Sequence, residues 1–266
     1  YFEEVLEIMR ALVAQDPGRA DLRQELSVSL NNLGEAASDG AAARGYLEQA
    51  LVILRALVVQ EPGRVDLRRS LSRSLIHLGI TAEAFGDGAS ARAYFEEAVE
   101  IRRELVAQDP GRADLKRDLS SSLGNLGHLT QGGGDVVGAR DYFEQALEIL
   151  RALVAQEPDR ADLKEELSVS LGNLGHLTQD AGEDAGARIY FEESLDIISA
   201  LATQDPRRAD LRMSLAIAYW NMYLASDDDG KKKDCLNMME RIIKGARRRG
   251  IKDERLNLLR RQLKIA

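Results

Sequence analysis

Apolar residues recur along most of the sequence at spacings of three and four, which places them on one face of an α-helix. A clear instance is the series Leu115, Leu119, Leu123, Leu126 and Leu129. A second stretch carries a wider apolar stripe, formed by Tyr142, Phe143, Ala146, Leu147, Leu150, Leu153 and Val154. A helix that is apolar over such a width needs neighbours on two sides. Because the alternation typical of β-strands is absent from the sequence, the pattern predicts an all-α fold.

The pattern is also periodic over a longer distance. The segment "YFEEVLEIMRALVAQDPGRADL", which begins at Tyr1, returns with few changes at Tyr46, Tyr94, Tyr142 and Tyr190, so the offsets are 45, 48, 48 and 48 residues. All five prolines occupy one position of this unit, at Pro17, Pro62, Pro110, Pro158 and Pro206. Proline cannot continue a helix, so each copy ends a helix there. Each unit therefore predicts a helical hairpin, and the hairpins must stack because one alone cannot bury a two-sided stripe.

The two helices of a unit are separated by turn-forming residues, such as "QGGGDVVG" at 131–138 and "QDAGEDAG" at 179–186. The first and last hairpins are three residues shorter, and we expect the shortening in this inter-helix loop. An Asp follows each proline turn, in the first turn of the next helix, where the helix dipole favours an anion: Asp21, Asp66, Asp114, Asp162 and Asp210. After one unpaired second helix, we predict hairpins at about 19–60, 64–108, 112–156, 160–204 and 208–249.

Composition narrows the class of protein. A sequence that is 44% apolar and 30% charged is expected to fold. Its apolar runs are far shorter than the roughly 20 residues that span a bilayer. No signal peptide is visible and the sequence lacks an initiator Met, so we interpret it as part of a larger protein. The single cysteine, Cys235, excludes an internal disulfide and favours a reducing, cytoplasmic location. Cys235 takes a position that other copies give to Tyr, so we expect it to be a packing residue.

The net charge of −8 conceals a basic C-terminal segment, 231–266, with 13 Lys and Arg against 4 Asp and Glu. Such a segment could bind nucleic acid or an acidic membrane. The aromatic residues that often accompany single-strand binding are missing, so a solvated face is the favoured interpretation. Within it, Leu256, Leu259 and Leu263 are spaced as in a helix. We predict a solenoid over residues 1–250 and a C-terminal capping helix over residues 251–266.

The units resemble tetratricopeptide repeats, whose pattern is W-x-x-L-G-x-x-Y in the first helix, A-x-x-x-F-x-x-A in the second, and a closing Pro. The matching residues of one copy are Leu123, Leu126, Gly127, Ala139, Phe143, Ala146 and Pro158. The unit is longer than the family's roughly 34 residues, as in bacterial long-helix members, and Leu replaces the Trp. The resemblance implies a right-handed α-solenoid whose first helices line a concave groove. It also implies protein or peptide binding without catalysis, and no cofactor.

The string "LGNLGHLTQ" occurs at 123–131 and again at 171–179. By the resemblance, Gly127 and Gly175 are packing glycines, whereas Gly124 and Gly172 face the groove. Glycine at these two positions is either a neutral replacement at an exposed site or a means of letting a partner's backbone approach the groove closely. Next to the latter lies a row of mostly amide residues, Asn32, His77, Asn125, Asn173 and Asn221. An amide donates and accepts hydrogen bonds at once and so suits a peptide backbone. The alternative is that these side chains are merely solvated.

Other residues that the resemblance turns toward the groove are Arg73, Ser121, His128, Val169 and His176. The three histidines lie in two different registers, so a metal site is not expected. The lone Trp220 is either an interface anchor or, the favoured interpretation, packed beneath the terminal helix.

No nucleotide-binding loop, G-x-S-x-G or H-E-x-x-H motif appears, so we do not expect an enzyme. The leading hypothesis is a non-catalytic scaffold that holds a peptide or protein element in its groove. Two alternatives stay open from the sequence. One is a regulatory sensor of a larger bacterial effector, with a signalling ATPase or caspase-like protease domain. The other is a self-assembly module.

Overall fold

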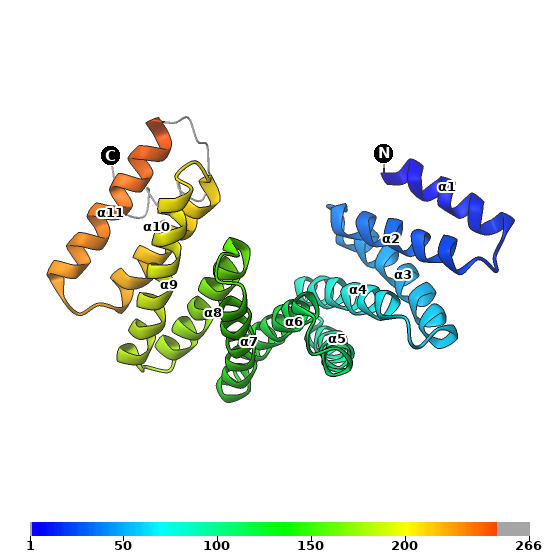
Figure 1. Ribbon diagram of the computed structural model, residues 1–266, viewed down its shortest axis with the longest axis horizontal. Coiled ribbons are helices and arrows are strands. Elements are labelled where there is room, and N and C mark those ends of the chain that lie inside the picture. Colours follow the sequence, from blue (N-terminus) through cyan, green and yellow to red (C-terminus); the bar gives the residue numbers. More distant parts are fainter. Residues whose placement is uncertain (1, 249–266) are drawn as a thin grey trace. The chain divides into compact units, whose positions relative to one another are not determined.

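A computed structural model describes residues 2–248, and within that range the protein is entirely helices and loops (Figure 1). The helices are α1 (Phe2–Gln15), α2 (Ala20–Ala36), α3 (Gly40–Gln60), α4 (Val65–Ala84), α5 (Gly88–Gln108), α6 (Ala113–Gly132), α7 (Val136–Gln156), α8 (Ala161–Asp180), α9 (Asp184–Gln204), α10 (Ala209–Ala225) and α11 (Asp229–Arg248). The predicted all-α fold is confirmed. The predicted capping helix at 251–266 lies outside the described residues.

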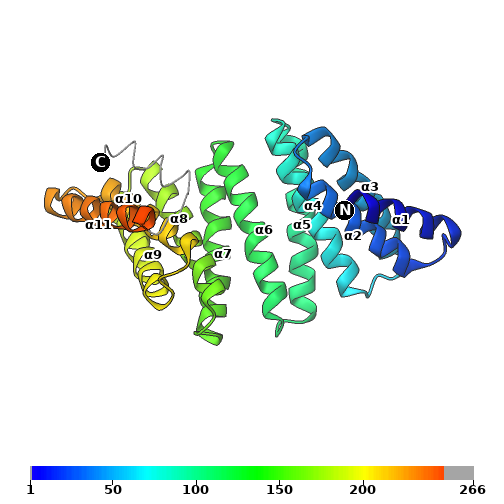
Figure 2. The same cartoon turned by 90° about the horizontal axis from the view of Figure 1, so that it is seen from above.

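The protein forms two compact units, Tyr1–Gly134 with α1–α6 and Asp135–Ala266 with α7–α11. Within each unit every helix packs against the next one in sequence, as Figure 2 shows. We call α2, α4, α6, α8 and α10 the A helices, and α1, α3, α5, α7, α9 and α11 the B helices. The B helices α3, α5 and α9 each contact A helices on two sides, as their wide apolar stripes require.

The close approach of A and B helices depends on a glycine near the end of the A helix. A Cβ built on Gly175 of α8 would lie 2.4 Å from Cε1 of Phe191 on α9. The same contact recurs in the first unit, where a Cβ on Gly79 would lie 2.3 Å from Phe95. Both phenylalanines are fully buried. The packing role predicted for Gly175 is confirmed, and the sequence equivalent Gly127 is buried in α6.

The prediction that the two short hairpins lose residues from their inter-helix loops is wrong. All five hairpins have three-residue loops, whereas α2 and α10 have 17 residues and α4, α6 and α8 have 20. The glycine-rich residues after Thr130 extend the A helix, by about 1.5 Å per residue. Each longer helix is then closed by a glycine with positive φ, at Gly86, Gly134 and Gly182. Only glycine adopts that conformation without strain.

The Asp predicted in the first turn of each A helix is there, and an arginine just before the helix binds it. Arg160 of the second unit donates from Nε and Nη2 to the two carboxylate oxygens of Asp162, at 2.8 and 2.7 Å. Arg112 makes the same pair of hydrogen bonds to Asp114. The hydrogen bonds from Arg112 lower the pKa of Asp114 to about 2. This Arg-x-Asp pairing fixes the start of the helix, a feature the sequence prediction missed.

Candidate functional site

Each A helix turns one face away from its B helices, and we call this surface the A face. It consists of three register rows. The amide row contains Asn32, His77, Asn125, Asn173 and Asn221. The row four residues earlier contains Val28, Arg73, Ser121, Val169 and Ile217, and the row three residues later contains Glu35, Ile80, His128, His176 and Leu224. All of these residues except Asn221 are half-buried or exposed. The A face of the first unit is carried by α2, α4 and α6, and that of the second by α8 and α10.

Three asparagines of the amide row have unused hydrogen-bonding capacity. Asn32, Asn125 and Asn173 are half-buried, and their side chains make no hydrogen bond to any other residue in the described range 2–248. Each amide can still donate and accept. Accessible amides at the predicted register position therefore occur in both units, at Asn32 and Asn125 in the first and at Asn173 in the second.

Asn221 must be removed from the predicted binding residues. It is only 7% exposed and is buried in the second unit. The sequence near it also differs from α8, because Trp220 stands where α8 has Gly172 and Tyr223 stands where α8 has Gly175. Their rings stack, with centroids 5.4 Å apart and an interplanar angle of 13°. Trp220 itself is half-buried and stacks on Tyr223 of the same helix, and the terminal helix predicted to cover it lies outside the described residues.

The histidines of the A face differ in their contacts. His77 lies with its Nε2 3.0 Å from a carboxylate oxygen of Glu35 on the neighbouring α2. Desolvation lowers the pKa of His77, and the charge of Glu35 opposes this shift. His176 is exposed and lies edge-on to Phe191, with ring centroids 5.1 Å apart. Partial desolvation lowers the pKa of both His128 and His176. Within residues 2–248, no three His, Cys, Asp or Glu side chains are grouped as metal ligands.

Glycines leave open space at two places on the A faces. A Cβ built on Gly124 or Gly172 would meet no atom within 4 Å. These positions therefore do not serve packing, in contrast to Gly175 on the same helix. The local surface is low beside Asn125 and Asn173, so another backbone can approach closely there.

The second unit's A face carries three exposed aliphatic side chains. Val169 is 63% exposed, Ile217 44% and Leu224 46%, although all three are large aliphatic side chains. Val169 and Ile217 are register equivalents on α8 and α10, and these helices are joined where Arg208 donates to both carboxylate oxygens of Glu165 at 2.6 and 2.8 Å. Aliphatic side chains held at equivalent positions of linked helices offer contacts to an apolar group.

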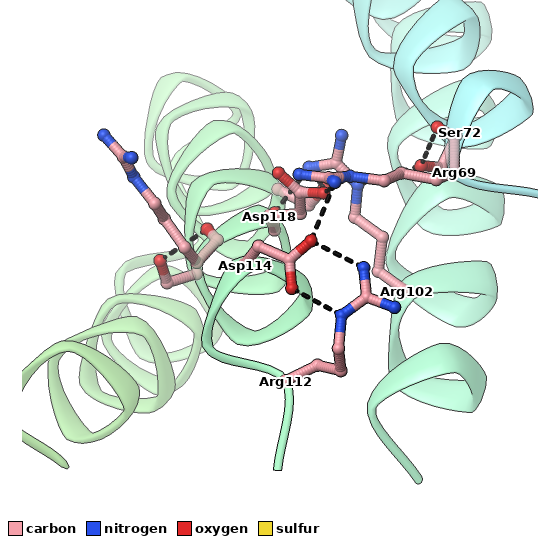
Figure 3. A network of polar contacts seen from close by, with 9 residues as sticks. Arg69, Ser72, Arg102, Arg112, Asp114 and Asp118 are labelled. Atoms are coloured by element: carbon pink, nitrogen blue, oxygen red, sulfur yellow. Dashed lines mark hydrogen bonds and ion pairs between the residues drawn. The ribbon is translucent and has the colours of Figure 1, made fainter. Parts of the chain in front are cut away.

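The first unit's A face carries the polar residues Arg73, His77 and Ser121 beside the exposed Ile80, and a polar network joins α4, α5 and α6 (Figure 3). Arg69 of α4 donates from Nη1 to Asp114 at 2.8 Å and from Nε to Asp118, both on α6. Arg112 binds Asp114 from the other side. The network therefore ties the starts of two successive A helices together.

Arg102 of α5 is the residue of this network that sequence reasoning missed. It is 7% exposed, and its guanidinium donates to the hydroxyls of Ser72 at 3.0 Å and Ser122 at 2.7 Å and to the backbone carbonyl of Asp118. Burial lowers its pKa to about 10, so it stays protonated at neutral pH. Its register equivalents are aliphatic, namely Leu54, Leu150 and Ile198. The sequence could have identified Arg102, because it is an arginine at a register position that holds aliphatic residues in these other copies.

Cys235 packs among buried side chains of α9 and α10, including Phe191 and Met222. Its predicted packing role is confirmed, and burial raises the pKa of the thiol. The described helices include none with the length and apolarity needed to cross a bilayer.

Stacked helical hairpins that leave one face of every A helix uncovered define an α-solenoid. Comparison with known proteins identifies the kind: residues 71–110, 119–158 and 167–202 match the tetratricopeptide repeat family. These three segments are therefore tetratricopeptide repeats, and such repeats generally serve as protein-interaction scaffolds without catalytic activity.

Solved structures agree on the fold. BtubC (BKLC) from P. vanneervenii is 19% identical with a TM-score of 0.68, over 92% of this chain and 89% of that one. The nuclear import adaptor Nro1 from S. pombe is 15% identical with a TM-score of 0.62, over 97% and 91%. A putative kinesin light chain with nearly identical TPR-like repeats from P. anserina is 18% identical with a TM-score of 0.52, over 89% and 98%. No curated protein sequence matches this one.

Proposed function

We propose that the A face of each unit binds an extended segment of a partner protein, and that the protein is a non-catalytic scaffold. The observation that carries this proposal is the row of half-buried side-chain amides with no hydrogen-bonding partner in residues 2–248, Asn32, Asn125 and Asn173. Each can accept from one backbone N–H and donate to one backbone carbonyl oxygen. An extended segment presents these groups along its length, whereas a helical ligand has already used them.

The neighbouring residues support an extended ligand. The open positions at Gly124 and Gly172 let a ligand backbone approach Asn125 and Asn173 closely. On the second unit, exposed Val169 lies one turn before Asn173 and offers contact to an apolar ligand side chain. The remaining proposed contacts on the rim are Ser121, His128 and His176, and His77 contributes together with its partner Glu35.

The regulatory-sensor role, the self-assembly role and the cytoplasmic location stay predictions from the sequence. No observation within residues 2–248 favours any of them over ligand binding at the A faces.

The test is a selection of displayed random dodecapeptides on the protein, followed by affinity measurement on purified variants. The double variant Asn125→Ala with Asn173→Ala should bind the selected peptides about fivefold more weakly, whichever unit they occupy, because one amide contributes about 1 kcal/mol in each unit. Its thermal stability should be nearly unchanged, since neither amide has a partner in the fold. Asn237→Ala, which removes an exposed amide of the B helix α11, is the matched control. Unchanged affinity in the double variant, or no selected peptide, would overturn the proposal.

A further inference from the structure

The first unit has a pocket on the side of α2 that faces away from its A face. The helices α1 and α3 both pack against α2 (Figure 1), and a pocket of about 570 Å³ lies between them. Its floor is formed by Leu26 and Leu30, which are each two residues from Val28 of the A face and so point the other way. Its walls include Val52 and Ile53 of α3. Pockets of this size with a mainly apolar lining accept apolar ligand groups.

The α3 wall of the pocket differs from the other B helices at three positions. The residues of α3 and their register equivalents on α5 and α9 are Gly45 against Ala93 and Ile189, Gln49 against Glu97 and Glu193, and Val52 against Glu100 and Asp196. Two carboxylates are thus replaced by neutral side chains, so an apolar group that binds here desolvates no charge at these positions. A Cβ built on Gly45 would meet no atom within 4 Å, so this glycine leaves space and does not serve packing.

Arg10 of α1 lines the pocket, and its guanidinium is held by hydrogen bonds. Its Nη1 donates to Glu7 at 3.1 Å and its Nη2 donates to Oε1 of Gln49 at 3.0 Å. Gln49 in turn donates to the backbone carbonyl of Gly45 at 3.0 Å. Because the N–H groups of a guanidinium lie in its plane, these bonds occupy the edge of the group and leave its faces available. A guanidinium face attracts the negative face of an aromatic ring.

The apolar surface of α3 continues beyond the pocket. Val52 is 70% exposed, and Val59, two turns further along the same side of the helix, is 81% exposed. The register equivalents of Val59 are the smaller or polar Ala14, Ala107, Ala155 and Thr203. Seven residues of helix span about 10 Å, which is longer than one aromatic ring. A ligand that covers both valines is therefore a segment of a protein and not a single small ring.

From these observations we infer that the pocket between α1 and α3 binds an aromatic side chain of a partner protein, and that Val59 contacts a second apolar residue of the same segment. The ring lies against Val52 and Ile53, with one face on the guanidinium of Arg10. Aromatic side chains that fill pockets are the strongest anchors of protein interfaces. The site uses the opposite side of α2 from the A face, so it does not depend on the proposed function. The first unit is therefore able to hold two ligands at once.

The first experiment follows the methyl NMR signals of the protein during addition of N-acetyl-tryptophan amide. The signals of Val52 and Ile53 should shift, whereas that of Val137, an exposed valine of the second unit, should not. Gly45→Ile, which installs the residue found at Ile189, should abolish the shifts by filling the pocket. Ala93→Ile adds the same side chain at the equivalent exposed position of α5 and should keep them. Equal shifts at Val137, or shifts that survive Gly45→Ile, would overturn the inference.

The role of Arg10 is tested with a saturated analogue of the ligand. N-acetyl-cyclohexylalanine amide should bind about threefold more weakly than N-acetyl-phenylalanine amide, since it lacks the attraction between the ring and the cation. Arg10→Met keeps the apolar stem of the side chain and should remove this difference. Equal affinities for the two amides in the unaltered protein would contradict an aromatic ligand.

A second experiment tests whether the ligand belongs to a protein segment. A pool of random dodecapeptides with a fixed central Trp should bind about tenfold more tightly than a pool with a fixed central Ala. Val59→Thr, which installs the residue found at Thr203, should weaken the Trp pool about threefold without affecting N-acetyl-tryptophan amide, since a buried methyl group contributes that much.

The outcomes of the pool experiment also separate this site from the A face. Gly45→Ile should abolish the preference for Trp, whereas the double variant Asn125→Ala with Asn173→Ala should keep it. A preference that survives Gly45→Ile, or is lost in the double variant, would contradict the pocket as its origin. Equal binding of the two pools, with the amide still bound, would show that the pocket accepts a small aromatic molecule and would overturn the assignment of a protein partner.

Discussion

At the scale of single residues, two glycines on α8 have different functions although they are three positions apart. Gly175 permits the contact with Phe191, because any larger residue would overlap the ring. Gly172 faces open space and has no such constraint. Sequence alone identified both, but only the local environment shows which one serves packing.

The two substitutions to alanine should therefore shift stability in opposite directions. Gly175→Ala should destabilise the protein by about 1–3 kcal/mol through overpacking. Gly172→Ala should stabilise it by up to about 1 kcal/mol, because alanine favours the helix. Urea unfolding of both variants measures the difference. The packing explanation would be wrong if Gly175→Ala were as stable as the unaltered protein.

The pair of His77 and Glu35 gives a prediction about pH. Desolvation lowers the pKa of His77 below its ordinary value of 6.5, and Glu35 partly restores it. Glu35→Gln should lower the pKa of His77 further, as an NMR titration of the ring would show. Because the folded-state pKa is below the unfolded one, His77 should cost stability as the pH falls from about 6.5 through the folded-state pKa. A pKa of His77 that rises in Glu35→Gln would contradict the stabilisation of the protonated ring by Glu35.

At the scale of helices, Arg102 is the residue that distinguishes one hairpin from its near-identical neighbours. It is buried between α4 and α6 and bonds to both. Equivalent B helices have Leu or Ile there, as at Leu54 and Leu150. A buried polar group can specify a pairing at some cost in stability. In an array of similar repeats, Arg102 favours the pairing of α5 with the helices that carry Ser72 and Ser122.

Replacing Arg102 by Leu should leave the free energy of unfolding unchanged or raise it, because the desolvation of a buried charge is removed while volume is kept. Arg102→Ala should instead cost about 3 kcal/mol or more, since it leaves a cavity as well. Chemical denaturation of both variants tests this pair. A large loss of stability in Arg102→Leu, comparable to that of Arg102→Ala, would show that the polar contacts of the arginine dominate.

The hairpins could be predicted from the sequence because two signals mark them. The wide apolar stripes reflect burial on two sides, and the prolines mark where each second helix ends. The helix ends could not, because glycine was taken as turn-forming whereas Gly132 continues α6. The amide row was found by aligning the repeats, and the same alignment misplaced Asn221, which is buried although its register equivalents are half-buried. Alignment conveys register, whereas burial depends on the neighbours in each copy. Arg102 is notable because it bonds to residues of two other helices, and Arg73 because its buried Nε has no hydrogen-bond acceptor. Neither property can be read from the sequence.

At the scale of the molecule, the two units present A faces of different chemistry on the same repeated scaffold. The first unit offers Arg73, Ser121 and the pair of His77 with Glu35, and the second offers Val169, Ile217 and Leu224. The amides Asn125 and Asn173 occur one in each unit. A segment bound to the second unit is therefore expected to carry apolar residues, and in each unit the ligand backbone is expected to be bound by the amide of that unit.

The most direct measurement is an NMR footprint of a selected peptide on the side-chain amide signals of the protein. Binding at the A faces predicts that the signals of Asn125 and Asn173 shift on addition of the peptide while that of Asn237 on α11 does not. Shifts confined to Asn237 and to other exposed residues of the B helices, with Asn125 and Asn173 unmoved, would contradict it.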